Sequence, residues 1–122
     1  MKKLWGILLA ALMLAGCGAQ ADYRRVNMEQ AQALMASEED YVILDVRTAE
    51  EYASGHIPGS VNLPLDRIGA AAELVPDRAC PLFVYCRSGA RSAQAAAQLG
   101  KMGYEKVKNI GGIAAYKGKA EY

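Results

Sequence analysis

The sequence predicts an α/β domain of three layers, in which a parallel sheet carries helices on both faces. Segments with strand character alternate with segments of helical periodicity over about a hundred residues, and this alternation is typical of a covered parallel sheet. The apolar runs at 42–44 and 82–85 are uninterrupted, as burial of a strand on both faces requires. With 122 residues, 52% of them hydrophobic, the chain can bury one such core.

Two of the predicted helices begin with a capping pattern. Asn27 and Gln30 have the spacing in which an N-cap residue and the residue three positions later satisfy each other's backbone N–H groups. Thr48 and Glu51 repeat this pattern and predict a short helix that closes near Gly55. After the first cap, one apolar face recurs with the 3.6-residue period of a helix: Met28, Ala31, Leu34 and Met35.

The other elements follow from shorter patterns of apolar, alanine-rich and glycine-rich sequence. We expect strands at 41–46, 60–64, 82–85 and 106–110, helices at 67–75 and 90–102, and a final turn or short helix at 111–118. The helix over 90–102 is the longest, and Gly103 ends it.

The first 25 residues predict export and membrane attachment. Residues 1–16 have a basic start and an apolar run of twelve residues, which is too short to cross a bilayer core of about 30 Å as a helix. The stretch Leu14 to Cys17 resembles the bacterial lipobox, which implies cleavage before Cys17 and lipidation of that residue. The alternative is an ordinary secretory signal with a chance cysteine. We therefore expect a lipoprotein signal peptide at 1–16, a polar linker at 17–25 and the domain at 26–122, anchored to the bacterial cell envelope and facing the periplasm.

Cys86 is predicted to be a free thiol although export favours disulfides. If residues 81–85 form a strand, Cys80 and Cys86 lie about 20 Å apart at roughly 3.3 Å per residue, beyond the limit of about 7 Å between bridged Cα atoms.

The formal net charge of +1 gives no indication of a nucleic-acid partner.

The residues after Cys86 predict a site that stabilises an anionic sulfur. Cys86 ends the central strand, and ligands of such sheets bind beyond the carboxyl ends of the strands. Gly89 can supply a left-handed conformation, so that backbone N–H groups of residues 87–91 face inward at the start of a helix. A helix dipole contributes about 0.3–1 kcal/mol, whereas an arginine about 4 Å away contributes about 4 kcal/mol at an effective dielectric near 20. We therefore expect the N–H groups and the arginines to dominate and Cys86 to be largely thiolate at neutral pH.

Three motifs resemble those of rhodanese-like sulfurtransferases of the single-domain thiosulfate sulfurtransferase type. CRSGARS at 86–92 resembles the active-site loop, and DVRTAEEYASGHIPGSVNLP at 45–64 resembles the second signature. NIGGIAAYKG at 109–118 is similar to the C-terminal segment, although Tyr116 stands where a tryptophan is common. The resemblance runs from about residue 26 to residue 122.

The resemblance implies covalent catalysis by Cys86. The thiolate attacks the outer sulfur of thiosulfate or another sulfane donor, sulfite leaves, and cyanide or a thiol removes the sulfur from the Cys86 persulfide. Arg87 and Arg91 would bind the anionic donor, and the N–H groups of the loop would hold the persulfide, which makes the substrate-binding set Arg87, Ser88, Gly89, Ala90 and Arg91. No metal or organic cofactor is expected. Four residues separate Cys86 from Arg91, against five in related phosphatase and arsenate-reductase loops, and the tighter ring suits sulfur.

Each of these residues has a simpler structural interpretation. Cys86 could be a buried structural thiol, Arg87 could point to solvent, and Arg91 could tie the loop to a carboxylate instead of facing the ligand.

Several neighbouring residues are expected to be structural. Asp45 and Arg47 are expected to form a charge pair and Glu51 to act as a helix cap. His56 is assigned to a structural turn, since an ionised thiolate needs no general base, and Cys80 is expected to be inert.

Two further functions remain open. The domain could be a sulfur carrier or a redox or anion-binding module with little turnover, and a weaker alternative is a phosphatase.

Overall fold

The computed structural model describes residues 22–38 and 40–122. The predicted signal peptide, the predicted lipidation residue Cys17 and most of the predicted linker lie outside the described residues. Within the described part of the chain, no helix is long and apolar enough to cross a membrane.

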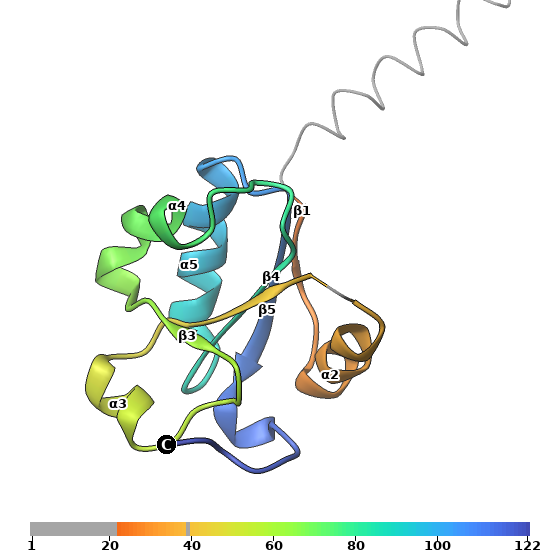
Figure 1. Ribbon diagram of the computed structural model, residues 1–122, viewed down its shortest axis with the longest axis vertical. Helices are drawn as coiled ribbons and strands as arrows, with labels where there is room; N and C mark the ends of the chain where they lie inside the picture. The colour runs from red at the N-terminus through yellow and green to blue at the C-terminus, as the bar shows by residue number, and fades with distance from the viewer. Residues whose placement is uncertain (1–21, 39) are drawn as a thin grey trace, which may run out of the picture.

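A five-stranded sheet forms the centre of the domain (Figure 1). Its strands lie in the order β1-β5-β4-β2-β3, and every paired strand is parallel to its neighbour. The strands are β1 (Asp22–Arg25), β2 (Val42–Asp45), β3 (Val61–Asn62), β4 (Leu82–Cys86) and β5 (Lys106–Gly112). The helical segments are α2 (Met28–Ser37), α3 (Ala49–Ala53), the 3₁₀ turn η1 (Leu65–Ala70), α4 (Ala71–Leu74), α5 (Ala90–Lys101) and the 3₁₀ turn η2 (Ile113–Ala115).

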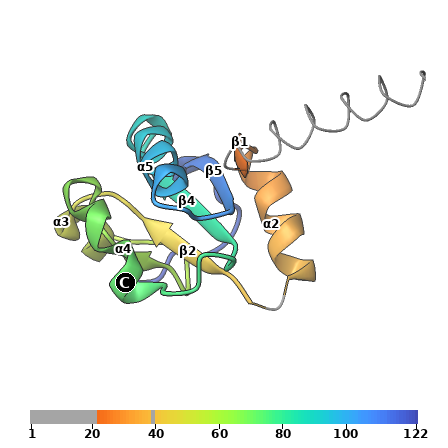
Figure 2. The same ribbon diagram turned by 90° about the horizontal axis from the view of Figure 1, so that it is seen from above.

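Two apolar clusters fill the space on either side of the sheet. One lies between the sheet and the layer of η1, α4 and α5, and the other lies between the sheet and α2. Figure 2, seen from above, shows α2 on one side of the sheet and α5 on the other. Along β4 the side chains alternate, so that Leu82, Val84 and Cys86 join the first cluster and Phe83 and Tyr85 the second. The predicted three-layer α/β fold is confirmed.

Both predicted capping boxes are present. Gln30 N–H donates to Asn27 Oδ1 at 2.7 Å, and Asn27 N–H donates to Gln30 Oε1 at 3.1 Å, which starts α2. Glu51 and Thr48 make the same reciprocal pair at the start of α3. Local sequence therefore sets the beginning of both helices.

Two segments differ from the sequence prediction. The helix expected at 67–75 is instead a 3₁₀ turn over 65–70 followed by one α-helical turn, because Gly69 weakens a helix interior and neither segment has a side-chain cap. Residues 22–25 were expected to be linker, yet they form the edge strand β1 and pair with β5. Pairing with the preformed edge of a sheet supplies the backbone hydrogen bonds that a short polar segment does not indicate by itself.

A buried ion pair closes the carboxyl end of β2. Asp45 is fully buried and its Oδ2 lies 2.6 Å from Nη2 of Arg47, which is 5% exposed. The same Arg47 nitrogen donates to the carbonyl of Gly55 at 2.8 Å, so the pair fixes the turn after α3. The predicted structural charge pair is confirmed.

The hydroxyl of Tyr85 fixes the same turn from β4. It accepts the N–H of Ile57 at 3.0 Å and lies 3.2 Å from the hydroxyl of Ser60. Burial raises the pKa of Tyr85, so the hydroxyl stays neutral and keeps its proton for hydrogen bonding.

Removal of the Asp45 charge is expected to destabilise the domain strongly. Asp45→Asn leaves the Arg47 guanidinium buried without a counter-charge, and breaking such a pair costs about 3–5 kcal/mol. Urea unfolding measures the loss. The control Asp66→Asn removes an exposed carboxylate and should change the free energy of unfolding by less than about 0.5 kcal/mol. An equally small effect of Asp45→Asn would contradict the structural role of the pair.

Candidate active site

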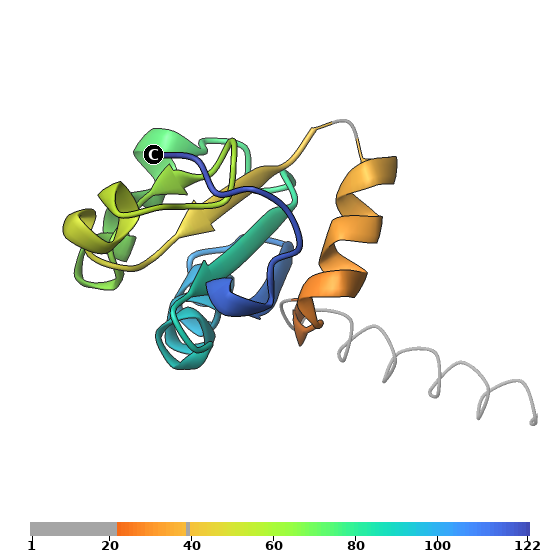
Figure 3. The same cartoon turned by 90° about the horizontal axis from the view of Figure 1, so that it is seen from below.

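Cys86 lies at the carboxyl edge of the sheet, at the end of the central strand β4. Figure 3 looks from below onto this edge, where β4 leads into α5 and β5 leads into η2. The Cys86 side chain is 1% exposed and contacts the cluster on the α5 side, because it is in register with Leu82 and Val84 on that face of β4. The sulfur is therefore held at the start of α5.

Gly89 turns the chain so that its N–H group faces the sulfur. Its φ angle is +106°, and it is the N-cap of α5. The Gly89 N–H donates to Cys86 Sγ at 2.9 Å. The left-handed conformation predicted for Gly89 is confirmed, and a side chain there would be strained.

Ser92 adds a hydroxyl to the same sulfur. Its Oγ lies 3.5 Å from Cys86 Sγ, 3.1 Å from the carbonyl of Gly89 and 2.7 Å from Oδ1 of Asn109. The hydroxyl has one proton, so these three acceptors compete for it. Ser92 and Asn109 are both buried, and electrostatic interactions are stronger in the protein interior than in water. The acceptor that receives the Ser92 proton therefore depends on the charge of the sulfur.

Asn109 connects the loop to β5. Its Oδ1 also accepts the N–H of Gly111 at 3.0 Å, and its Nδ2 lies 3.4 Å from the carbonyl of Gly89. Sequence reasoning missed both Ser92 and Asn109. The available signal was a polar residue in the predicted strand 106–110, since a buried polar side chain in such a strand needs specific partners.

Glycine at position 112 lets β5 approach the loop. A Cβ atom there would lie 2.3 Å from the carbonyl oxygen of Arg87, so the loop would have to move for any other residue. Cys86 is the register partner of Gly112 in the β4–β5 pairing. The close contact between strand and loop therefore requires this glycine.

The environment of Cys86 lowers the pKa of its thiol. Burial is the largest influence and raises the pKa, but hydrogen bonds from the Ser92 hydroxyl and from the N–H groups of Ser92, Gly89 and Ser88 together outweigh it. The direction agrees with the sequence prediction. The prediction that the arginines are also dominant is wrong, because they are not among these main causes.

Arg91 is paired with a carboxylate instead of standing free beside the sulfur. Its Nη1 and Nη2 donate to Oε1 and Oε2 of Glu51 at 2.8 and 3.0 Å. Arg91, together with the N–H of Thr48, lowers the pKa of Glu51 to about 2. Glu51 therefore both caps α3 and ties the loop to α3, which is one of the two arrangements predicted for Arg91.

The remaining predicted binding residues lie at the surface. Arg87, Ser88 and Ala90 are exposed. Of these three, Ser88 contributes through its backbone N–H to the lowered pKa of the Cys86 thiol. Donor binding by the loop residues stays a prediction.

His56 and the second cysteine have structural surroundings. Nδ1 of His56 lies 2.8 Å from the carbonyl of Tyr52, and its ring stacks on the Tyr52 ring at 3.6 Å between centroids. Cys80 and Cys86 are both free thiols, as predicted, and burial raises the pKa of Cys80. Over residues 22–38 and 40–122, no three histidine, cysteine or acidic side chains gather where they could hold a metal ion.

Loss of the Ser92 hydroxyl is expected to raise the pKa of the Cys86 thiol. A hydrogen bond to a charged group contributes about 1.5–3 kcal/mol, which corresponds to about 1–2 pKa units. The pH profile of iodoacetamide alkylation at Cys86 measures this shift, and its midpoint should move to higher pH in Ser92→Ala. The control Ser88→Ala keeps the backbone N–H that faces the sulfur and should leave the midpoint in place. Equal profiles for Ser92→Ala and the wild type would contradict the role of the hydroxyl.

Comparison with known proteins agrees with this geometry. The model of the rhodanese-like domain family matches residues 27–119. A sulfurtransferase of Allochromatium vinosum is 41% identical over 93 residues, which cover 75% of this chain and 85% of the relative. The thiosulfate sulfurtransferase PspE of Escherichia coli is 41% identical over 71 residues, which cover 57% of this chain and 68% of the relative. A solved structure described as rhodanese with anions, from Escherichia coli, superposes with a TM-score of 0.63 at 35% identity, covering 66% of this chain and 96% of that one.

Proposed function

Because this chain belongs to the rhodanese-like domain family, we propose that it transfers a sulfane sulfur from thiosulfate, or a similar anionic donor, to a thiol or to cyanide. Relatives named as sulfurtransferases at about 41% identity support a rhodanese-type sulfurtransferase. The observation that carries the proposal is the 2.9 Å hydrogen bond from Gly89 N–H to Cys86 Sγ. It makes a buried sulfur suitable for holding negative charge.

In the first half-reaction, the Cys86 thiolate attacks the outer sulfur of thiosulfate. A bond forms between Sγ and that sulfur, the bond between the two sulfurs of thiosulfate breaks, and sulfite leaves with the electron pair. Charge is balanced, since a thiolate and a dianion become a persulfide anion and a dianion. No proton moves, so the step needs no general base.

In the second half-reaction, an acceptor attacks the outer sulfur of the persulfide. With cyanide, a carbon–sulfur bond forms, the persulfide bond breaks, and its electron pair returns to Cys86 as thiolate. Thiocyanate leaves and the free enzyme is restored. Two half-reactions with a covalent intermediate give ping-pong kinetics.

The surroundings of the sulfur suit a persulfide anion. The Gly89 N–H already faces the sulfur, and the Ser92 hydroxyl can turn from Asn109 toward negative charge that develops there. The Gly89 N–H is a preorganised donor, which stabilises a developing anion without rearrangement. The loop with four residues between Cys86 and Arg91 favours this chemistry over phosphate hydrolysis.

Exposure to thiosulfate is expected to add one sulfur atom to Cys86. Intact-mass analysis should show the gain in the wild type and in the control Cys80→Ser, and no gain in Cys86→Ser. The reason is that, of the two cysteines in the described residues, Cys86 is the one with backbone N–H groups and a hydroxyl arranged around its sulfur.

Addition of cyanide then separates turnover from storage of sulfur. Release of thiocyanate over many cycles supports the enzyme, whereas a stable persulfide without thiocyanate would replace it with a sulfur-carrier role. Absence of any sulfur gain at Cys86 would overturn the proposal. Hydrolysis of an aryl phosphate in that case would favour the phosphatase.

We also propose that the domain is attached to the bacterial cell envelope through lipid on Cys17, facing the periplasm. The basic start, the short apolar run and the Leu14–Cys17 stretch support this proposal. Several acyl chains on one residue give stable anchoring, where a single chain is marginal.

Replacement of Cys17 is expected to abolish lipidation. In a bacterium grown with labelled palmitate, the full chain should incorporate label, Cys17→Ser should incorporate none, and the control Cys80→Ser should match the wild type. An unlabelled wild-type protein would contradict the lipoprotein assignment.

A further inference from the structure

One of the two predicted donor-binding arginines of the loop, Arg91, is already neutralised. Both terminal nitrogens of Arg91 bond to the Glu51 carboxylate, and the carboxylate stays ionised because its pKa is about 2. A bidentate pair of this kind is directional and leaves little net charge for a second anion. Of the two loop arginines this leaves the exposed Arg87, so another cation beside the loop would add to the positive charge that a dianionic donor meets.

Arg25 lies beside the same loop, although it is far away in sequence. It is the last residue of β1, and pairing with Asn109 of β5 brings it to the carboxyl edge of the sheet. If residue 89 carried a Cβ atom, that atom would lie 3.6 Å from Nη2 and 3.7 Å from Nη1 of Arg25. Gly89 is also the residue whose N–H donates to the Cys86 sulfur.

Two glycines make room for this guanidinium. A Cβ atom at residue 111 would lie 3.4 Å from Nη2 of Arg25. Gly89 and Gly111 both have positive φ angles, +106° and +92°. The planar group therefore rests against bare backbone on two segments. Among the described residues, no carboxylate forms an ion pair with Arg25, and its side chain is exposed.

We propose that Arg25 is a donor-binding residue that attracts the anionic end of the sulfur donor to Cys86 and makes the site selective for anionic over neutral donors. The inference rests on the proposed function. In this arrangement the outer sulfur of the donor meets the Cys86 thiolate, while its sulfonate group stays at the rim with the guanidinium. A guanidinium suits this task because it remains charged and offers a fork of N–H donors to sulfonate oxygens.

The test compares alkylation of Cys86 by anionic iodoacetate and by neutral iodoacetamide. The rate at the Cys86 peptide is followed by mass spectrometry at low ionic strength, and the ratio of the two rates reports the charge at the mouth. Arg25→Gln should lower this ratio by about threefold to tenfold, as expected for one charge several ångströms from the reacting sulfur. The iodoacetamide rate should stay unchanged, whereas a merely structural role would alter both rates together.

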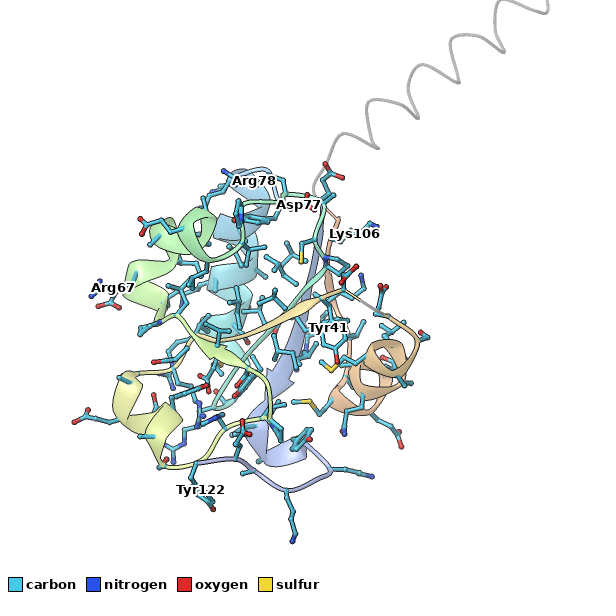
Figure 4. All side chains as sticks on the ribbon, viewed as in Figure 1. Tyr41, Arg67, Asp77, Arg78, Lys106 and Tyr122 are labelled. Atoms are coloured by element: carbon cyan, nitrogen blue, oxygen red, sulfur yellow. The ribbon has the colours of Figure 1, made fainter. Side chains whose placement is uncertain are left out.

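Matched variants separate charge at this position from charge in general. Arg25→Lys should retain most of the preference for iodoacetate. Arg67→Gln removes one positive charge from η1, where Arg67 lies on the outer side of the molecule (Figure 4), and should leave the ratio unchanged.

Kinetics with sulfur donors form the second arm. Arg25→Gln should raise KM for thiosulfate by a factor similar to the change in the alkylation ratio, with kcat changed less than about twofold.

An unchanged alkylation ratio in Arg25→Gln, or an equal loss with both reagents, would overturn the inference. Because alkylation requires no sulfur transfer, this result is distinct from failure of the proposed function, which is a wild-type protein that gains no sulfur from thiosulfate. In that second case the donor-binding role falls with the function.

Discussion

The site depends on an ionisable sulfur being held in the protein interior with backbone N–H groups directed at it. Burial alone opposes the charged form of Cys86, so the thiolate exists there only if hydrogen bonds compensate. The direction of the Gly89 N–H is the critical part, and it follows from a backbone conformation that glycine adopts without strain. The rest of the domain fixes the two ends of this turn.

Different elements of the fold fix the two ends of the turn. The preceding end belongs to β4, whose side chains are buried on both faces, so Cys86 cannot shift without disturbing both clusters. The following end is bound to β5 through Asn109, while Glu51 holds Arg91 from α3. The Asp45–Arg47 pair then fixes the turn after α3. Packing, a buried amide and two ion pairs thus restrict a loop that is only a few residues long.

Sequence patterns predict those parts of the site that depend on local conformation. The end of β4 at Cys86, the left-handed Gly89 and the cap at Thr48 are local properties, and all three are present. Asn109 and Arg25 act through contacts between segments that are distant in the chain, and only the parallel pairing of β1, β5 and β4 brings those segments together. Ser92 lies close to Cys86 in the chain, but its hydroxyl also bonds to Asn109 of β5. For the same reason the sequence did not reveal β1, since an edge strand is stabilised by its neighbour more than by its own composition.

Hydrogen bonds reach the Cys86 sulfur, whereas the arginine charges are either compensated or at the surface. This arrangement affects how reactive the thiolate is. A thiolate loses intrinsic nucleophilicity as its pKa falls, with a Brønsted coefficient of about 0.4–0.5. An unpaired arginine against the sulfur would lower the pKa further and make the anion less reactive. Glu51 compensates the charge of Arg91, and the hydrogen bonds from Ser92, Gly89 and Ser88 are the main influences that lower the pKa of the Cys86 thiol. Positive charge at the rim, where Arg87 and Arg25 are exposed, can then attract a donor without weakening the attacking sulfur to the same degree, because solvent screens charges at the surface more than in the interior.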